Sequence, residues 1–61
     1  MEIMYKGTVA YHTPTNIIYV TSLYRRMEDA EEMAEAFAED MVLRGKRPSY
    51  IFRDVVKVYV Y

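Results

Sequence analysis

The sequence predicts an α+β fold, in which a three-stranded, mainly antiparallel sheet carries one helix on one of its faces. Two stretches with strand character lie near the N-terminus, separated by a short turn, and a third ends the chain. Between them, residues 27–43 are rich in Ala, Glu and Met, which are strong helix formers. The element order is therefore β-β-α-β. At 61 residues the chain forms a single domain, residues 1–61, with no room for a second core.

The first two strands are predicted to form a hairpin. Residues 2–11 alternate in the way of a half-buried strand. One of its faces carries Ile3, Tyr5, Val9 and Tyr11. Gly7 interrupts the pattern, which indicates a bulge or a close approach by another group. Residues 12–16 (HTPTN) supply turn chemistry, and the β-branched and aromatic run 17–22 makes the second strand.

Residues 27–43 are predicted to form the helix, because their apolar residues follow the i, i+3, i+4, i+7 rule. The apolar stripe consists of Ala30, Met33, Ala34, Phe37 and Met41. Acidic residues occupy the first turn and Arg44 follows the last, and both placements are favourable with the helix dipole. Gly45 suits the position just after the helix, and Pro48 prevents its continuation. Ser22 is an alternative cap for an earlier start.

The last segment, residues 50–61, is predicted to be a strand that is apolar on both faces. The simplest sheet has the order 2-1-3, with the third strand antiparallel to the first. We expect the helix to cover Tyr5, Val9, Ile18, Val20, Val56, Val58 and Val60. The other face is then bare and carries Met4, Ile17, Tyr19, Val55, Tyr59 and Tyr61. A slip of one residue in a strand's register would exchange its two faces.

Composition argues against several classes of protein. The chain has no cysteine and one histidine, His12, so disulfides, thiolate zinc sites and histidine metal clusters are not expected, and no cofactor is predicted. No apolar run approaches the ~18 residues of a membrane span, so we expect a cytoplasmic protein without membrane contact. Catalysis and a small-molecule substrate are not expected. His12 lies in a turn without an orienting partner, and carboxylates such as Glu31 and Glu35 lie on a solvated helix face.

The charges are segregated along the chain. Residues 27–43 carry seven acidic residues and no basic one, whereas the rest of the chain carries eight basic residues and two acidic ones, Glu2 and Asp54. The formal net charge of −1 is therefore the near-cancellation of an acidic helix against a basic remainder. A solvated face balanced by neighbouring bases is the plain explanation. An acidic surface that steers and selects a basic partner is the functional one.

These features support a non-enzymatic binding module, because 52% of the residues are hydrophobic in a chain with a small core. We expect a homodimer that binds a protein partner, as an inhibitor, an antitoxin-like protein or an accessory protein of a mobile element would. The contact surface is either the bare sheet face, an exposed strand edge, or the acidic helix face. The acidic helix face carries Glu28, Glu31, Glu32, Glu35 and Glu39.

The alternative function is nucleic-acid binding. Bases would stack on Tyr19, Tyr59 and Tyr61 of the bare sheet face while basic residues track phosphates. The candidate phosphate-binding residues are Lys6, Arg25, Arg26, Arg44, Lys46, Arg47 and Lys57.

One resemblance to a known family is present. The Ala- and Glu-rich run 28–36, which follows a hairpin and precedes Gly45 and Pro48, resembles the hairpin–helix part of HicB-type antitoxins. The resemblance implies a small β-β-α-β-type fold that binds a toxin partner. The separate DNA-binding tail of that family has no counterpart in these 61 residues, and no site residue is carried over.

Overall fold

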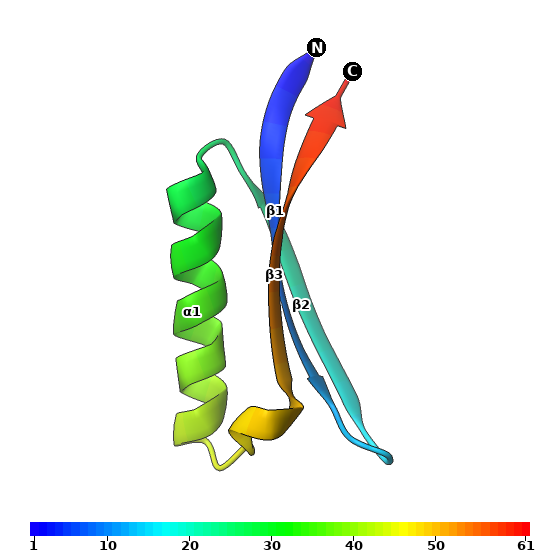
Figure 1. The fold of residues 1–61 in the computed structure, drawn as a ribbon, viewed down its shortest axis with the longest axis vertical. Helices are drawn as coiled ribbons and strands as arrows, with labels where there is room; N and C mark the ends of the chain where they lie inside the picture. Colours follow the sequence, from blue (N-terminus) through cyan, green and yellow to red (C-terminus); the bar gives the residue numbers. More distant parts are fainter.

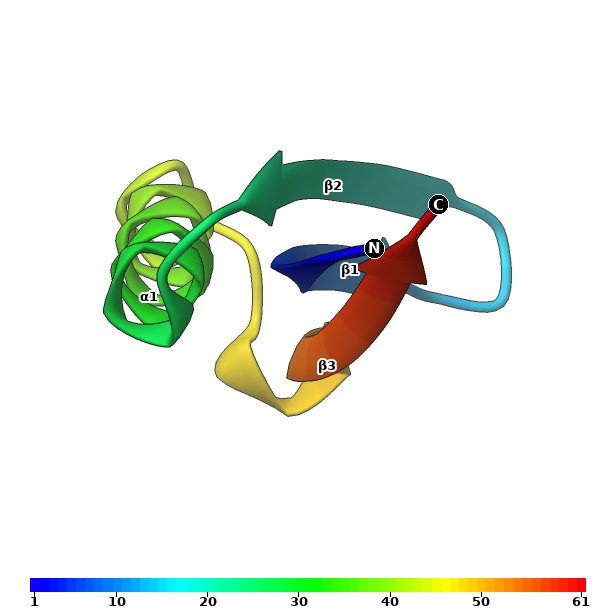
Figure 2. The ribbon, with the colours of Figure 1, turned by 90° about the horizontal axis from the view of Figure 1, so that it is seen from above.

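The computed structural model describes all 61 residues and has the predicted architecture (Figure 1). Its elements are β1 (Glu2–His12), β2 (Ile17–Tyr24), α1 (Met27–Leu43), a short 3-10 turn (Pro48–Tyr50) and β3 (Ile51–Val60). The strands form one sheet in the order β2-β1-β3, and β1 is antiparallel to both neighbours, which confirms the predicted topology. The molecule has two layers, because α1 lies on one face of the sheet and nothing in the chain covers the other (Figure 2).

The β1–β2 hairpin is held at its tip by the turn residues that the sequence places there. The Thr13 amide donates to the Asn16 carbonyl oxygen at 2.8 Å, and the Thr13 hydroxyl oxygen accepts from the Asn16 amide at 3.0 Å. Strand β2 continues to Tyr24, two residues beyond the predicted end. Ser22 therefore pairs with Gly7 inside the sheet instead of capping the helix, and the N-cap position belongs to Arg26.

Gly45 lies just after the C-terminus of α1, as the sequence predicts. Gly45 has a φ of 93°, in the left-handed region that favours glycine. The Lys46 amide donates to the Met41 carbonyl at 2.9 Å, and the Gly45 amide donates to the Val42 carbonyl at 3.0 Å. These two hydrogen bonds define a Schellman motif, which satisfies carbonyls that the helix itself leaves free.

Replacing Gly45 with alanine is expected to lower the free energy of unfolding by about 1 kcal/mol, because a Cβ disfavours the left-handed conformation. Gly45→Asn is expected to cost less, since asparagine tolerates this region. Urea unfolding followed by circular dichroism measures both. A Gly45→Ala protein as stable as the unmodified chain would show that the helix ends without the left-handed residue.

The core lies between α1 and the covered face of the sheet. Val9 is fully buried among Met33, Ala34, Ala38 and Met41. The side chains packed around this cluster are Tyr11, Ile18, Tyr24 and Ile51. The prediction that Phe37 belongs to the buried stripe is wrong, because its side chain is 43% exposed.

Small residues mark the line of contact between α1 and the sheet. Ala30, Ala34 and Ala38 are all buried, so the line of contact with the sheet follows this i, i+4, i+8 row. Phe37 lies on the neighbouring row between Met33 and Met41, which are both buried, so its exposure does not follow from its helical position. Helical spacing alone does not reveal which side of the stripe meets the sheet most closely.

Gly7 marks the closest approach of the helix to the sheet. A Cβ built on Gly7 would lie 2.9 Å from the Ala30 carbonyl oxygen and 2.9 Å from the Met33 methyl carbon. Gly7 also pairs in register with Ser22 on one side and Val55 on the other. Of the two roles that the sequence indicates for this glycine, the structure therefore shows the close approach.

The predicted faces are confirmed for β1 and β2 and are wrong for β3. Val55 lies opposite Gly7 and therefore shares the helix-covered face, whereas Val56 lies opposite Lys6 on the bare face. By the same alternation Val58 and Val60 face away from the helix, and Tyr59 faces the helix side. Tyr61 follows the last residue of the sheet and belongs to neither face.

Candidate interaction surfaces

The bare side of the sheet, which we call the open face, is mostly apolar. Strand alternation and the register of both ladders place its residues, of which nine are apolar and six are polar. The apolar members are Met4, Ala10, Ile17, Tyr19, Leu23, Phe52, Val56, Val58 and Val60. The polar members are Glu2, Lys6, Thr8, His12, Thr21 and Asp54. Tyr19 is 61% exposed and Phe52 is 58% exposed, so large rings stand in solvent on this side.

The open face is organised in rows that cross the three strands. Tyr19, Ala10 and Phe52 lie opposite one another in one row, and Leu23, Lys6 and Val56 form another. Large apolar side chains that are exposed together on one face favour an interaction site.

A polar row lies between these two. Thr21, Thr8 and Asp54 are opposite one another, and the Thr8 and Thr21 hydroxyl oxygens are 3.4 Å apart. Lys6 and Asp54 are diagonal neighbours on the face, and neither forms an ion pair within the chain. The face therefore carries one unpaired charge of each sign near its middle.

The acidic residues of α1 do not form one common surface. All five predicted members of the acidic helix face are exposed. Glu28 pairs with Arg26 at 3.3 Å, and Asp40 pairs with Arg44 at 2.9 Å. Glu31, Glu35 and Glu39 line hollows between α1 and β3, whereas Glu28 and Glu32 line none.

Glu28 is the one acidic residue with a resolved pKa shift. Its position at the start of α1 allows a hydrogen bond to the backbone, and Arg26 adds a hydrogen bond and a favourable charge, so the pKa of Glu28 is lowered. A lowered folded-state pKa means that its small stabilisation is present at neutral pH and is lost as the pH falls through that pKa. The carboxylate of Glu28 therefore stabilises the N-terminus of α1.

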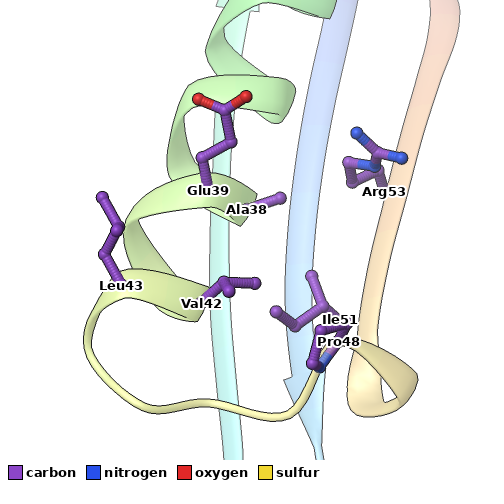
Figure 3. Close-up of a pocket in the computed structure, with 7 residues that line it drawn as sticks. All are labelled: Ala38, Glu39, Val42, Leu43, Pro48, Ile51 and Arg53. Carbon is purple, nitrogen blue, oxygen red and sulfur yellow. The ribbon is translucent and has the colours of Figure 1, made fainter.

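A groove runs between the C-terminal half of α1 and the start of β3 (Figure 3). We call it the α1–β3 groove. It has a volume of about 400 Å³ and is lined by Ala38, Glu39, Val42, Leu43, Pro48, Ile51 and Arg53. Figure 3 shows Glu39 and Arg53 toward one end, on opposite walls, with Val42, Ile51 and Pro48 toward the other.

A second hollow continues the groove toward the N-terminus of α1. It has a volume of about 300 Å³, and it shares Arg53 with the first hollow. The other residues that line it are Glu31, Ala34, Glu35, Asp54 and Val55. The continuous surface is thus apolar at one end and bordered by carboxylates along α1.

The candidate phosphate-binding residues lie at opposite ends of α1. Arg25 and Arg26 precede the 17-residue helix, and Arg44, Lys46 and Arg47 follow it, so about 25 Å separates the two groups. Several are already engaged. Arg25 pairs with Glu2 at 3.4 Å, and the ammonium of Lys46 lies 5.0 Å from the centroid of the Tyr11 ring.

The predicted aromatic stacking face is also divided. Tyr19 and Lys6 belong to the open face, but Tyr59 and Lys57 lie on the helix side of β3. No face of the sheet brings these tyrosines and lysines together, so the predicted set does not form one stacking surface.

Three residues of these surfaces are not predicted from the sequence. Phe52 and Leu23 on the open face, and Arg53 in the groove, were not singled out. Strand alternation would have found Phe52 only with the register of β3 known. No group of three or more His, Asp or Glu side chains is placed to hold a metal ion, and His12 is exposed at the hairpin turn. α1 lacks the length and apolar character needed to cross a bilayer.

No protein-family model, curated protein or solved structure matches this chain. The resemblance to HicB-type antitoxins therefore rests on the features of the sequence alone. The class that the structure itself defines is a small α+β domain, with one helix on one face of a three-stranded sheet.

Proposed function

We propose that this protein is a non-catalytic binding module that acts through protein–protein contact and forms a two-fold homodimer through its open face. The observation that carries the proposal is the composition of that face, in which nine of fifteen residues are apolar and large rings are exposed. Only seven of the 61 residues are buried, so the chain by itself covers little of its apolar surface. A covered open face supplies the second half of the core.

A second copy of the chain is the occupant that suits this face best. In a two-fold arrangement the same residues meet from both sides, so the charges must complement themselves. The unpaired Lys6 and Asp54 meet this requirement, because the lysine of one copy can pair with the aspartate of the other. A strongly acidic or basic partner would leave one of these charges opposed by its own sign.

Stacking of the open faces leaves the helices free. Two twisted sheets pack about 10 Å apart, with their strands within about 30° of each other. Both copies of α1 then lie on the outside of the dimer, and the α1–β3 groove of each copy stays accessible to a partner protein. We also propose a cytoplasmic location, on the sequence grounds given above.

Because the chain has no cysteine, one introduced cysteine places a single spin label on each copy. Glu32→Cys puts the label on the exposed outer side of α1, away from the open face. Stacked open faces put two sheets between the helices, so double electron–electron resonance is expected to give a label separation of at least about 30 Å, three layer spacings of about 10 Å.

Two results would contradict the proposal. A separation below about 20 Å would place the helices side by side, as when the sheets join at their edges or the helices pair. The absence of any dipolar interaction at high protein concentration would show a monomer. A label at Thr15→Cys, on the hairpin turn, serves as a second reference point for the relative orientation of the copies.

A further inference from the structure

We propose that the α1–β3 groove and the free edge of β3 together bind an extended, basic segment of a partner protein, which adds to the sheet as a fourth strand. This inference rests on the proposed function as a protein-binding module and names the chemistry of the partner. It concerns a surface that stays exposed when the open faces are stacked. The structural basis is an unpaired strand edge next to a groove whose α1 wall carries glutamates.

The edge of β3 offers main-chain hydrogen bonds. β3 is an outer strand in the order β2-β1-β3, and all ten of its residues belong to a ladder with β1 on one side only. None of the backbone hydrogen bonds outside the regular elements covers its other side. Such an edge is a template for an extended peptide, and strand addition is a common mode of peptide recognition.

The side chains of an added strand would alternate between the two faces of the sheet. Those on the helix side would lie over the α1–β3 groove, because β3 forms one of its walls through Ile51, Arg53 and Val55. β2 is also an edge strand, but no hollow of the molecule includes a β2 residue. The geometry therefore favours β3 over β2.

The glutamates of α1 that border the groove are spaced like alternate residues of a β-strand. Glu31, Glu35 and Glu39 follow one another at i, i+4 and i+8 on α1, so they are about 6 Å apart along the helix axis. Alternate side chains on one face of a strand are about 6.6 Å apart. Because α1 runs alongside β3 (Figure 1), lysines or arginines at alternate positions of the added strand meet these three glutamates in succession.

The apolar end of the groove determines one further residue type in the bound segment. Beyond Glu39 its walls are Ala38, Val42, Leu43, Pro48 and Ile51. The next helix-facing side chain of the added strand therefore meets an apolar pocket and should be aliphatic. Arg53 is the one basic residue in the lining, against the carboxylates of Glu31, Glu35 and Glu39 on α1, so the groove keeps a net negative charge.

The probe for this proposal is a synthetic eight-residue peptide. One leucine and three lysines occupy its alternate positions, and threonines fill the others. Titration at low salt, followed by two-dimensional nitrogen–proton NMR, is expected to shift amide signals of β3 and of the α1 residues that line the groove. No binding at millimolar peptide, equal binding of a peptide with glutamates in place of the lysines, or shifts confined to the open face would each overturn the proposal.

Two variants distinguish an effect of the groove on peptide binding from an effect of the overall charge of the helix. Glu35→Lys, inside the groove, is expected to weaken peptide binding about tenfold, which corresponds to about 1.4 kcal/mol. Glu32→Lys makes the same change in charge on the same helix but outside the groove, and is expected to change the affinity less than about threefold. Equal losses in the two variants would show that the peptide responds only to net charge.

Methylation of the peptide backbone tests strand addition itself. Alternate amides of the peptide face β3, so N-methylation of that set is expected to abolish binding while methylation of the other set leaves it intact. The same effect from both sets would contradict strand addition. The outcome is also separable from the proposed homodimer. A protein that dimerises but ignores the peptide overturns only the groove proposal, and one that binds the peptide as a monomer overturns only the dimer.

Discussion

Replacing Gly7 with alanine is expected to lower the free energy of unfolding by about 1–3 kcal/mol, because the added methyl group overpacks the contact between helix and sheet. The Met33 methyl group can move aside, but the Ala30 carbonyl oxygen is part of the helix backbone and lies 2.9 Å from the new Cβ. The helix must therefore shift, which loosens the contacts of Ala34 and Ala38 with Val9. The better strand propensity of alanine returns only about 0.5–1 kcal/mol.

The loss is large for a chain of this size, since native proteins have about 0.05–0.15 kcal/mol of stability per residue. Urea unfolding measures the change, and Ser22→Ala is the control. Ser22 lies opposite Gly7 in the ladder and is exposed, so its replacement is expected to have little effect. A Gly7→Ala protein as stable as the unmodified chain would show that α1 does not sit as close to β1 as the structure places it.

Replacing Phe52 with aspartate is expected to dissociate the homodimer without unfolding the monomer. Phe52 is 58% exposed on the open face, so in a single copy the change costs little. In the stacked dimer the aspartate would be buried against apolar side chains. Loss of an aromatic interface residue of this kind costs at least about 2 kcal/mol, so the dissociation constant is expected to rise at least about 30-fold.

Tyr59→Asp is the matched control for this prediction. Tyr59 belongs to the same strand, is similarly exposed at 50%, and lies on the opposite face of the sheet. Sedimentation velocity over a range of protein concentrations compares the two variants, and far-ultraviolet circular dichroism checks the fold. If Tyr59→Asp dissociated the dimer and Phe52→Asp did not, the helix side of β3 would be the interface.

The elements that were predicted correctly have strong local signals. The hairpin turn follows from Thr13, Pro14 and Asn16, and the end of the helix follows from Gly45. Both depend on residues within a few positions of each other. The sheet order then follows from the connection lengths, because β2 is joined to β1 by a tight turn and to β3 only through the helix.

The register of β3 needed information that its own residues do not carry. Val55 and Val56 are adjacent and both apolar, so alternation does not distinguish the faces. Arg53 and Lys57 share the helix side, where an apolar face would be expected. Arg53 is exposed there and lines the groove between α1 and β3, so the covered face of this strand is not fully buried. How much of β3 the helix covers depends on the tertiary packing, so the residues of β3 alone do not predict it.

The candidate sites, like the fold, are only partly predictable from the sequence. That the acidic residues of α1 are exposed follows from the helical period of the sequence. That Glu31, Glu35 and Glu39 line the groove while Glu28 and Glu32 do not depends on where β3 lies relative to the helix. Composition therefore predicts an acidic helix, and only the packed structure separates its residues by location.

Sedimentation equilibrium of the unmodified protein shows directly whether a second copy of the chain covers the open face. The stacked dimer is expected to give a molar mass that rises with concentration to twice the 7.3 kDa of one chain and goes no higher. A molar mass that stays at 7.3 kDa up to the highest soluble concentration would contradict it.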